Sequence, residues 1–302
     1  MAFRLDLDKK ATSAARKTLA KRLSKAAERF GDDDPGAALH DARKDLKKSR
    51  SLLRLMRPAL TPELYRREME ILRGIARSLS AARDADVLPA TLAGLREDCP
   101  GEVPEVAYVS LETRLLGRAN GSDPGRTLGD RVADLEAASR RVEEWPLRDL
   151  GWDDLVGQLE WSYRRGRRAM GAARREPGDE RLHEWRKRTK DLLYQLQLLD
   201  AAWPSVLDAY VTQSHRLADL LGDDHDLAVL LAVLGDNGTA PPAVEPIVRL
   251  VRRRRADLQA RAWGLGIRLY AEPPKALRRR LAALISAARS HDDEVPPFQC
   301  AA

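Results

Sequence analysis

Two short segments of this chain carry the same arrangement of one histidine and three cations. They are residues 40–47 and 183–190, so the repeat distance is 143 residues (183 − 40). Both segments follow the frame His-acid-x-Arg-Lys-x-x-Lys. Guanidinium and ammonium groups bind phosphate oxygens, arginine through a planar fork and lysine as a mobile point charge. A duplicated cationic frame therefore predicts a polyanionic ligand.

The spacing of the frame predicts that its side chains share one face of a helix. An α-helix turns about 100° per residue, which brings offsets 0, 3, 4 and 7 into one sector. That face carries His40, Arg43, Lys44 and Lys47 in the first copy and His183, Arg186, Lys187 and Lys190 in the second. It continues to Ser51 and Arg54 in one copy and to Tyr194 and Gln197 in the other.

The opposite face of each expected helix is apolar, as shown by Leu46 in the first copy and Leu196 in the second. Such a helix packs its apolar side against a core. A basic face on a single helix is usually solvated surface. Here, however, the polar positions agree between the copies, whereas apolar positions such as Ala42 and Trp185 differ. This comparison favours an anion-binding surface.

The two frame histidines, His40 and His183, have two interpretations. A histidine on a helix is more often a hydrogen-bonded structural residue than a ligand contact. Neighbouring cations disfavour imidazolium until an anion arrives, and then the anion favours it. We expect both histidines to donate to phosphate, so that binding tightens as the pH falls through the histidine range.

A second pair of matching segments follows the frames, in residues 79–88 and 221–230. Aligning Ser80 with Gly222 pairs Arg83 with His225, at an offset of 142 residues (222 − 80). Two matches in the same order and at nearly constant offset indicate a tandem duplication.

Composition indicates an all-α chain with a basic surface. The hydrophobic content of 43% can form a core in 302 residues. Alanine, leucine and arginine favour helices, and no segment alternates between polar and apolar residues as a half-buried strand would. The formal charge is +7, with arginine runs at 252–255 and 278–280. We expect helical repeats at residues 1–148 and 149–290 and a flexible tail at 291–302, with helices near 8–30, 36–56, 62–82, 152–175 and 243–269.

Several segments together resemble the CHAD domain, the conserved histidine α-helical domain. They are the two frames, Ala-Arg-Asp-Ala-Asp-Val-Leu at 82–88, Tyr-Arg-Arg-Gly-Arg-Arg at 163–168 and Leu-Leu-Gly-x-x-His-Asp at 220–226. The resemblance covers about residues 5–290. It implies two pseudo-symmetric four-helix bundles with a basic groove or cavity between them that binds inorganic polyphosphate. The second copy departs from the first at Asp191 and Gln195, which stand where the first has Lys48 and Leu52.

From the two frames and the resemblance to the CHAD domain, we expect a non-catalytic module that binds polyphosphate without a cofactor or a metal. It would target or organise polyphosphate granules, together with enzymes of polyphosphate metabolism. The amino terminus has no hydrophobic signal core, and no apolar run is long enough to span a membrane. We therefore expect a cytoplasmic protein with no membrane partner. The expected polyphosphate contacts are His40, Arg43, Lys44, Lys47, Arg50, Arg54, Arg164, Arg168, His183, Arg186, Lys187 and Lys190.

An enzyme is the first alternative. Asp84, Asp86 and Asp226 could hold a divalent metal for phosphoester chemistry, with Asp224 and His225 beside them. Ion pairing or helix capping explains these carboxylates more simply. The chain has neither a Gly-x-x-x-x-Gly-Lys-Ser/Thr loop nor a His-Glu-x-x-His motif.

A nucleic-acid-binding protein is the second alternative, because any basic helical surface attracts phosphate backbones. Single-strand binding uses exposed aromatic rings to stack bases. The six Trp, six Tyr and three Phe residues are expected mainly in the core, as at Trp185 and Trp203. Weak non-specific binding to nucleic acid stays open.

Overall fold

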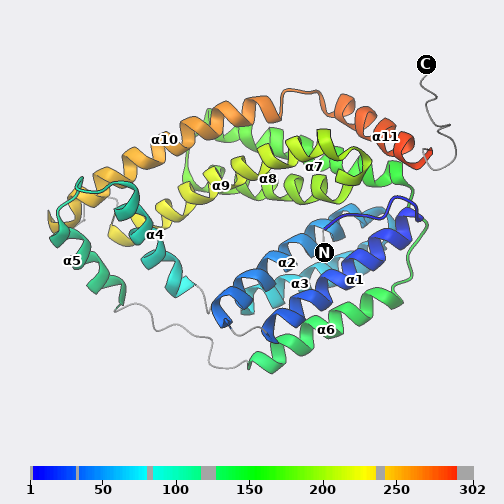
Figure 1. Cartoon of the computed structure of the whole chain (residues 1–302), viewed down its shortest axis with the longest axis horizontal. Helices are drawn as coiled ribbons and strands as arrows, with labels where there is room; N and C mark the ends of the chain where they lie inside the picture. The colour runs from blue at the N-terminus through cyan, green and yellow to red at the C-terminus, as the bar shows by residue number, and fades with distance from the viewer. Residues whose placement is uncertain (1–2, 32–33, 80–83, 117–126, 236–241, 291–302) are drawn as a thin grey trace, which may run out of the picture.

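All secondary-structure elements in the described part of the chain are helices. The computed structural model describes residues 3–31, 34–79, 84–116, 127–235 and 242–290. The all-α class predicted from the sequence is confirmed (Figure 1). The α-helices are α1 (Ala11–Glu28), α2 (Pro35–Leu55), α3 (Pro62–Ser78), α4 (Asp84–Asp98), α5 (Glu105–Leu116), α6 (Leu128–Glu144), α7 (Trp152–Arg175), α8 (Asp179–Leu199), α9 (Pro204–Leu234), α10 (Glu245–Leu269) and α11 (Pro274–Ser290).

The helices form two packed groups that meet along α2 (Figure 1). In one group α1 packs on α2 and α6, while α3 packs on α2 and α6. In the other, α8 lies between α7 and α9, with α10 on α9 and α11 on α7. Because α2 also contacts α7 and α8, a single hydrophobic core continues from one group into the other.

The segment with α4 and α5 leaves the first group and packs on the second. A separate apolar cluster joins these helices to the C-terminal part of α9 and the N-terminal part of α10, with Leu111 and Val251 fully buried in it. The two halves of the chain are therefore interlocked at this end of the molecule. The finer arrangement, two pseudo-symmetric bundles over 1–148 and 149–290, stays a prediction.

Local sequence signals explain where the helices that carry the frames begin. The Asp34 carboxylate accepts hydrogen bonds from the backbone N–H groups of Gly36 and Ala37, at 2.9 and 3.0 Å, and so caps α2. Thr61 caps α3 in the same way, ahead of Pro62 in its first turn. The expected helix limits agree with those of α7 and α10. Helix α3 ends at Ser78, and the rest of the expected segment runs into residues 80–83, outside the described residues.

The apolar sides of both frame helices are buried, as predicted. Ala42 and Leu46 of α2 have no exposed surface, and neither has Trp185 of α8, whose ring stacks on Trp263 at 4.6 Å between centroids. Trp203 is different, because it is 50% exposed. It lies in the short connection between α8 and α9, so its placement in the core was wrong.

The frame helices α2 and α8 touch near their C-terminal ends and separate toward their N-terminal ends (Figure 1). At the contact, Ser51 Oγ donates to the carbonyl oxygen of Asp191 at 3.0 Å, and Gln195 Nε2 donates to the carbonyl oxygen of Ser51 at 3.5 Å. Ser51 is fully buried there. The expectation that it extends an open polar face was therefore wrong, because the facing helix covers it.

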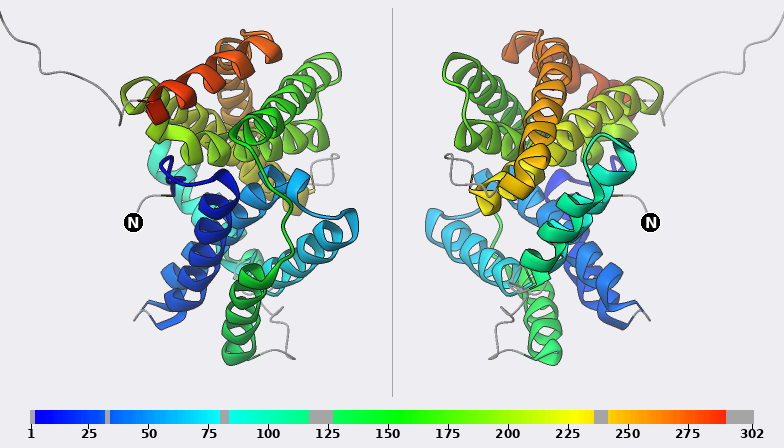
Figure 2. Two further views of the ribbon diagram at one scale, coloured as in Figure 1. Left: turned by 90° about the vertical axis from the view of Figure 1, so that its right-hand side faces the viewer. Right: turned by 90° about the vertical axis from the view of Figure 1, so that its left-hand side faces the viewer.

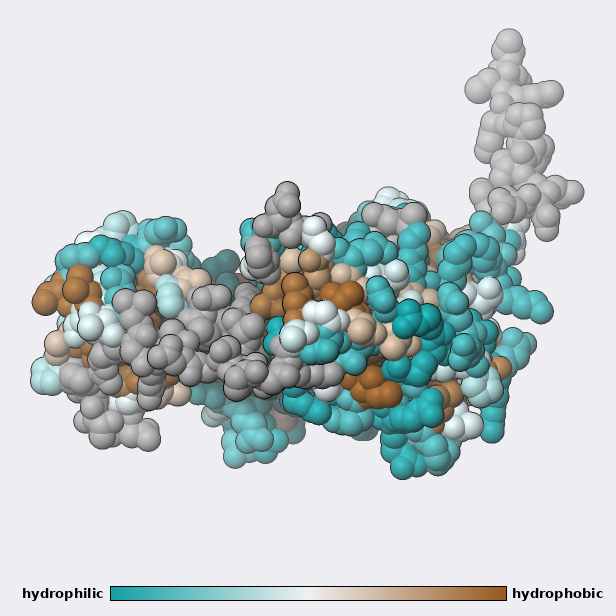
Figure 3. All heavy atoms as spheres, turned by 90° about the horizontal axis from the view of Figure 1, so that it is seen from below, coloured by the Kyte–Doolittle hydropathy of each residue, from teal (hydrophilic) through white to brown (hydrophobic). Residues whose placement is uncertain are grey.

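One face of the molecule can be followed in a space-filling view. The face in Figure 3 is largely hydrophilic, with small separate apolar patches. None of the described helices is both long enough and apolar enough to cross a membrane.

Candidate functional site

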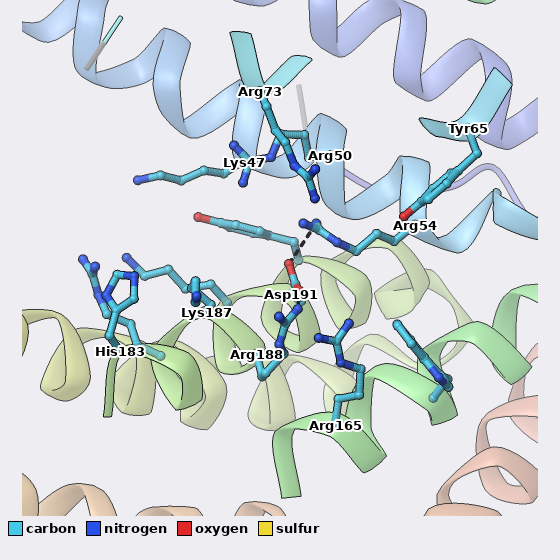
Figure 4. A pocket seen from close by; sticks show the side chains of 14 residues that line it. Lys47, Arg50, Arg54, Tyr65, Arg73, Arg165, His183, Lys187, Arg188 and Asp191 are labelled. Carbon is cyan, nitrogen blue, oxygen red and sulfur yellow. Dashed lines mark hydrogen bonds and ion pairs between the residues drawn. The ribbon is translucent and has the colours of Figure 1, made fainter. Parts of the chain in front are cut away.

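A basic cavity of about 480 Å³ lies between α2, α3, α7 and α8 (Figure 4). Side chains from α2 and α3 point across it toward side chains from α7 and α8. Tyr65, Trp161, His183 and Tyr194 contribute to its wall, together with a single carboxylate, that of Asp191. The nine cations that line it are Lys47, Arg50, Arg54, Arg73, Arg165, Arg186, Lys187, Arg188 and Lys190.

Seven of the twelve predicted contacts line this cavity. They are Lys47, Arg50, Arg54, His183, Arg186, Lys187 and Lys190. The second frame contributes all four of its positions, whereas the first contributes only Lys47. The reason is the divergence of α2 from α8 toward the N-terminal end of α2, which leaves His40 and Lys44 exposed and away from the cavity. The two copies therefore contribute different positions to this cavity, and phosphate contacts by His40 and Lys44 stay a prediction.

Three further predicted contacts, Arg43, Arg164 and Arg168, do not line the cavity either. Arg164 forms an ion pair with Glu160 of its own helix, and Arg168 is exposed to solvent. The cavity instead uses Arg165 of the same Tyr-Arg-Arg-Gly-Arg-Arg segment.

Sequence reasoning missed several residues of the wall. On α7, Trp161 and Arg165 are four residues apart, so they share a helix face, and the Arg165 guanidinium lies 4.6 Å from the centre of the Trp161 ring. The four-residue spacing from Trp161 could therefore have indicated Arg165 as a residue of the same wall. In contrast, Tyr65 and Arg73 come from α3, where no frame signals them, and only packing of α3 on α2 places them here.

Asp191 links the two frame helices at the edge of the cavity. Its carboxylate accepts from Arg54 of α2 at 3.0 Å and from Arg188 of α8 at 3.2 Å. Both members of the Arg54–Asp191 pair are largely buried, with side chains 15% and 14% exposed. Asp191 stands where the first copy has Lys48, and this carboxylate holds two arginines in place.

Glu184 plays a similar part at the opposite end of the second frame. It pairs with Lys187 at 2.8 Å and with Arg188 Nε at 2.6 Å, and Arg165 lies 3.8 Å away. Burial raises the pKa of Glu184, but the hydrogen bonds from Lys187 and Arg188 outweigh burial and leave the pKa below its ordinary value. The carboxylate therefore stays ionised and positions cations.

The positive charge of Arg50 is destabilised by burial and by neighbouring cations. Burial first, and then the neighbouring Arg54 and Arg73, lower the pKa of Arg50. Its Nε is buried and has no hydrogen-bond partner among the described residues. Because a guanidinium does not deprotonate in a protein, the charge persists, and the cost of desolvating it would be offset by an anion in the cavity.

His183 is neutral at neutral pH. Burial, the ring of His225 at 4.4 Å between centroids, and the cations Lys187 and Arg186 lower the pKa of His183 to about 4, while Glu184 acts weakly in the other direction. Its Nδ1 is buried and makes no hydrogen bond within the described residues. The predicted effect of neighbouring cations on this imidazole agrees with the structure.

Neither Asp224 nor Asp226, two carboxylates of the metal alternative, lines this cavity. Asp224 is 2% exposed and accepts from Arg255 Nε at 3.0 Å and from Gln259 at 2.8 Å, so it anchors α9 to α10. Asp226 lines a different hollow, and the side chains of Asp84 and Asp86 lie outside the described residues. Within the described ranges, no group of three or more His, Cys, Asp or Glu residues could hold a metal ion.

Comparison with known proteins identifies the family. A family model described as the CHAD domain matches residues 11–235, which include both frames and all the helices that wall the cavity. A search of curated proteins finds no match. Since the matched region covers most of the 302 residues, the chain belongs to the CHAD family of helical domains, which is linked in general to polyphosphate and phosphate metabolism.

Proposed function

We propose that this protein binds inorganic polyphosphate in the cavity between α2, α3, α7 and α8. The observation that carries the proposal is the composition of the wall, where nine lysine and arginine side chains accompany one carboxylate. The cations come from four helices and approach from both sides (Figure 4). This arrangement suits a flexible chain of anions better than a single compact one.

The chemistry of polyphosphate matches the wall. The polymer has a negative charge on every phosphate unit and no base edges to read, so a site for it needs many donors and little shape selection. Arginines can bind two oxygens of one phosphate, and lysines can follow the chain as it moves. Arg54, Arg165 and Arg188 are oriented in advance by Asp191 and Glu184, which reduces the entropy lost on binding.

We further propose a non-catalytic role, in which the protein organises polyphosphate granules together with enzymes of polyphosphate metabolism. A tandem duplication that produced two pseudo-symmetric bundles accounts for the repeated frames. Non-specific nucleic-acid binding is the competing function. Competition between polyphosphate and DNA of equal phosphate concentration, at equal salt, distinguishes them, because preferential retention of DNA would contradict the proposal.

A single pair of variants tests the cavity. Lys47 lines it, whereas Lys44, one turn away on the same helix, is exposed and does not. We expect Lys47→Ala to weaken binding of tripolyphosphate, measured by calorimetry, by about 1.5–3 kcal/mol, the contribution of a hydrogen bond to a charged group. Lys44→Ala should leave the affinity nearly unchanged. Equal losses in the two variants would show that the cavity is not the binding site.

A further inference from the structure

A second basic hollow, of about 290 Å³, lies along α1 and the segment that precedes it. Six cations line it, namely Arg4, Lys9, Lys17, Lys21, Arg22 and Lys25. Asp6 is the one carboxylate in its wall. Cations therefore outnumber carboxylates in this wall as well, although the hollow shares no residue with the cavity described above.

Three of these cations form a row on one helix. Lys17, Lys21 and Lys25 are spaced four residues apart, so they lie on one face of α1. Within the part of the chain that the structure describes, none of the three forms an ion pair with a carboxylate. Like charges at this spacing repel each other and destabilise a helix. An anion bound along the row would remove that repulsion.

The other three cations form ion pairs with carboxylates. Arg4 pairs with Asp200 at 3.4 Å, and Lys9 pairs with Asp6 at 2.9 Å. Arg22 is buried and pairs with Asp45 at 2.9 Å. The hollow therefore combines a row of lysines that form no ion pair with a carboxylate of the described residues and a wall of cations that do.

The wall on the amino-terminal side is anchored. The backbone N–H of Leu5 donates to the carbonyl oxygen of Leu198 at 2.8 Å, and the side chain of Leu5 is 1% exposed. Phe3 is buried, with the guanidinium of Arg22 and the ammonium of Lys48 at 4.7 and 5.3 Å from its ring centre. These contacts hold the segment beside α1, so the hollow is a formed feature of the fold.

The two basic sites are lined by different helices. In the side views of Figure 2, the amino-terminal segment and α1 lie on one side of the first helix group. Helix α3, which walls the first cavity, lies on the other side together with α7. A short phosphate chain bound in one site leaves the other site open.

We propose that the hollow along α1 is a second anion site that takes phosphate groups of the same polymer, so that one molecule engages two polyphosphate segments at once. The identity of the ligand rests on the proposed function above. Two sites that share no lining residue can each hold a separate segment, and each added link raises the effective concentration for the next. Bridging of this kind condenses long polyphosphate chains into a network.

The test compares two triple charge reversals in the full chain. Lys17→Glu/Lys21→Glu/Lys25→Glu changes the row, and it keeps the helix propensity because glutamate and lysine are similar helix formers. Arg261→Glu/Arg268→Glu/Lys275→Glu changes the net charge equally at three exposed positions that line neither site. Circular dichroism should show that both variants are folded.

Two measurements give distinct outcomes. Calorimetry with tripolyphosphate should count two sites in the wild type and the control but one in the row variant, with the affinity of the remaining site retained. Light scattering with long-chain polyphosphate should show particles for the wild type and the control, and their loss in the row variant. One site in the wild type, unchanged in the row variant, would overturn the second site and leave the proposed function intact. No binding of either polyphosphate to the wild type would overturn both.

Discussion

The salt dependence of binding offers a quantitative test of how the cavity works. Lys47 and Lys190 occupy equivalent positions of the two frames, and both line the cavity. We consider the double variant Lys47→Ala/Lys190→Ala, which removes one cation from each wall. Alanine is a strong helix former, so α2 and α8 should persist.

The structure sets the expected magnitudes. The nine cations and one carboxylate give the wall an excess of eight positive charges (9 − 1) with His183 neutral. Each phosphate contact contributes about −0.7 to the slope of log affinity against log salt for a single-stranded polyanion, so the slope can reach about −6 if every excess charge takes part. Removing two contacts should make the slope shallower by about 1.4. Binding at low salt should weaken by about 3 kcal/mol, roughly a hundredfold.

The assay is fluorescence anisotropy of a labelled short polyphosphate at several sodium chloride concentrations between about 50 and 200 mM. The control is Lys44→Ala/Arg168→Ala, which removes two exposed cations outside the cavity and should leave the slope as in the wild type. If the cavity variant binds more weakly but keeps the wild-type slope, the lysines act on the fold and not on the phosphates, and the reasoning is refuted.

Three further predictions test individual features of the site and the fold. Asp191→Asn removes the one carboxylate of the cavity wall but keeps a side-chain oxygen that can still accept from Arg54 and orient it. The loss of negative charge should therefore prevail, so that tripolyphosphate binds more tightly in calorimetry, and weaker binding would contradict this. The thermal midpoint should fall because the bonds to Arg54 and Arg188 lose their charge, a cost of about 1–3 kcal/mol. The imidazole of His183 should titrate near pH 4 by NMR. Because the pKa of His183 in the folded protein lies below the ordinary 6.5, the unfolded chain takes up the proton first as the pH falls. The free energy of unfolding should therefore decrease between about pH 6.5 and pH 4. Bound phosphate should raise the pKa of His183, so affinity should increase on acidification in the wild type but less so in His183→Gln; identical pH profiles would exclude a role for this histidine. Gly166→Ala should lower the free energy of unfolding in urea by about 1–3 kcal/mol because a Cβ there would overlap the Tyr270 ring. In the control Gly171→Ala, the nearest side-chain atom to the added Cβ lies at 3.6 Å, so the free energy of unfolding should rise by up to about 1 kcal/mol. Similar changes in the two variants would rule out the packing explanation.

Local patterns in the sequence were sufficient to predict the helices and their buried sides. The three-and-four spacing of Ala42 and Leu46, or of Leu182 and Trp185, depends only on the geometry of one helix, and these residues are buried. Capping residues and prolines act within a few positions, so the starts of α2 and α3 could also be predicted. The duplicated cations also selected the second frame, and all four of its positions line the cavity, while the polyanionic ligand that they indicate stays a prediction.

Only the tertiary structure decided which cations meet. His40 and Lys44 have the same spacing as His183 and Lys187, yet they lie outside the cavity because α2 diverges from α8 at its N-terminal end. Arg73 enters the wall because α3 packs on α2. The row on α1 becomes a hollow because a backbone hydrogen bond from Leu5 ties the amino-terminal segment to the end of α8. The direction in which two helices cross depends on side chains distributed through the whole core, and a pattern confined to one helix does not contain that information.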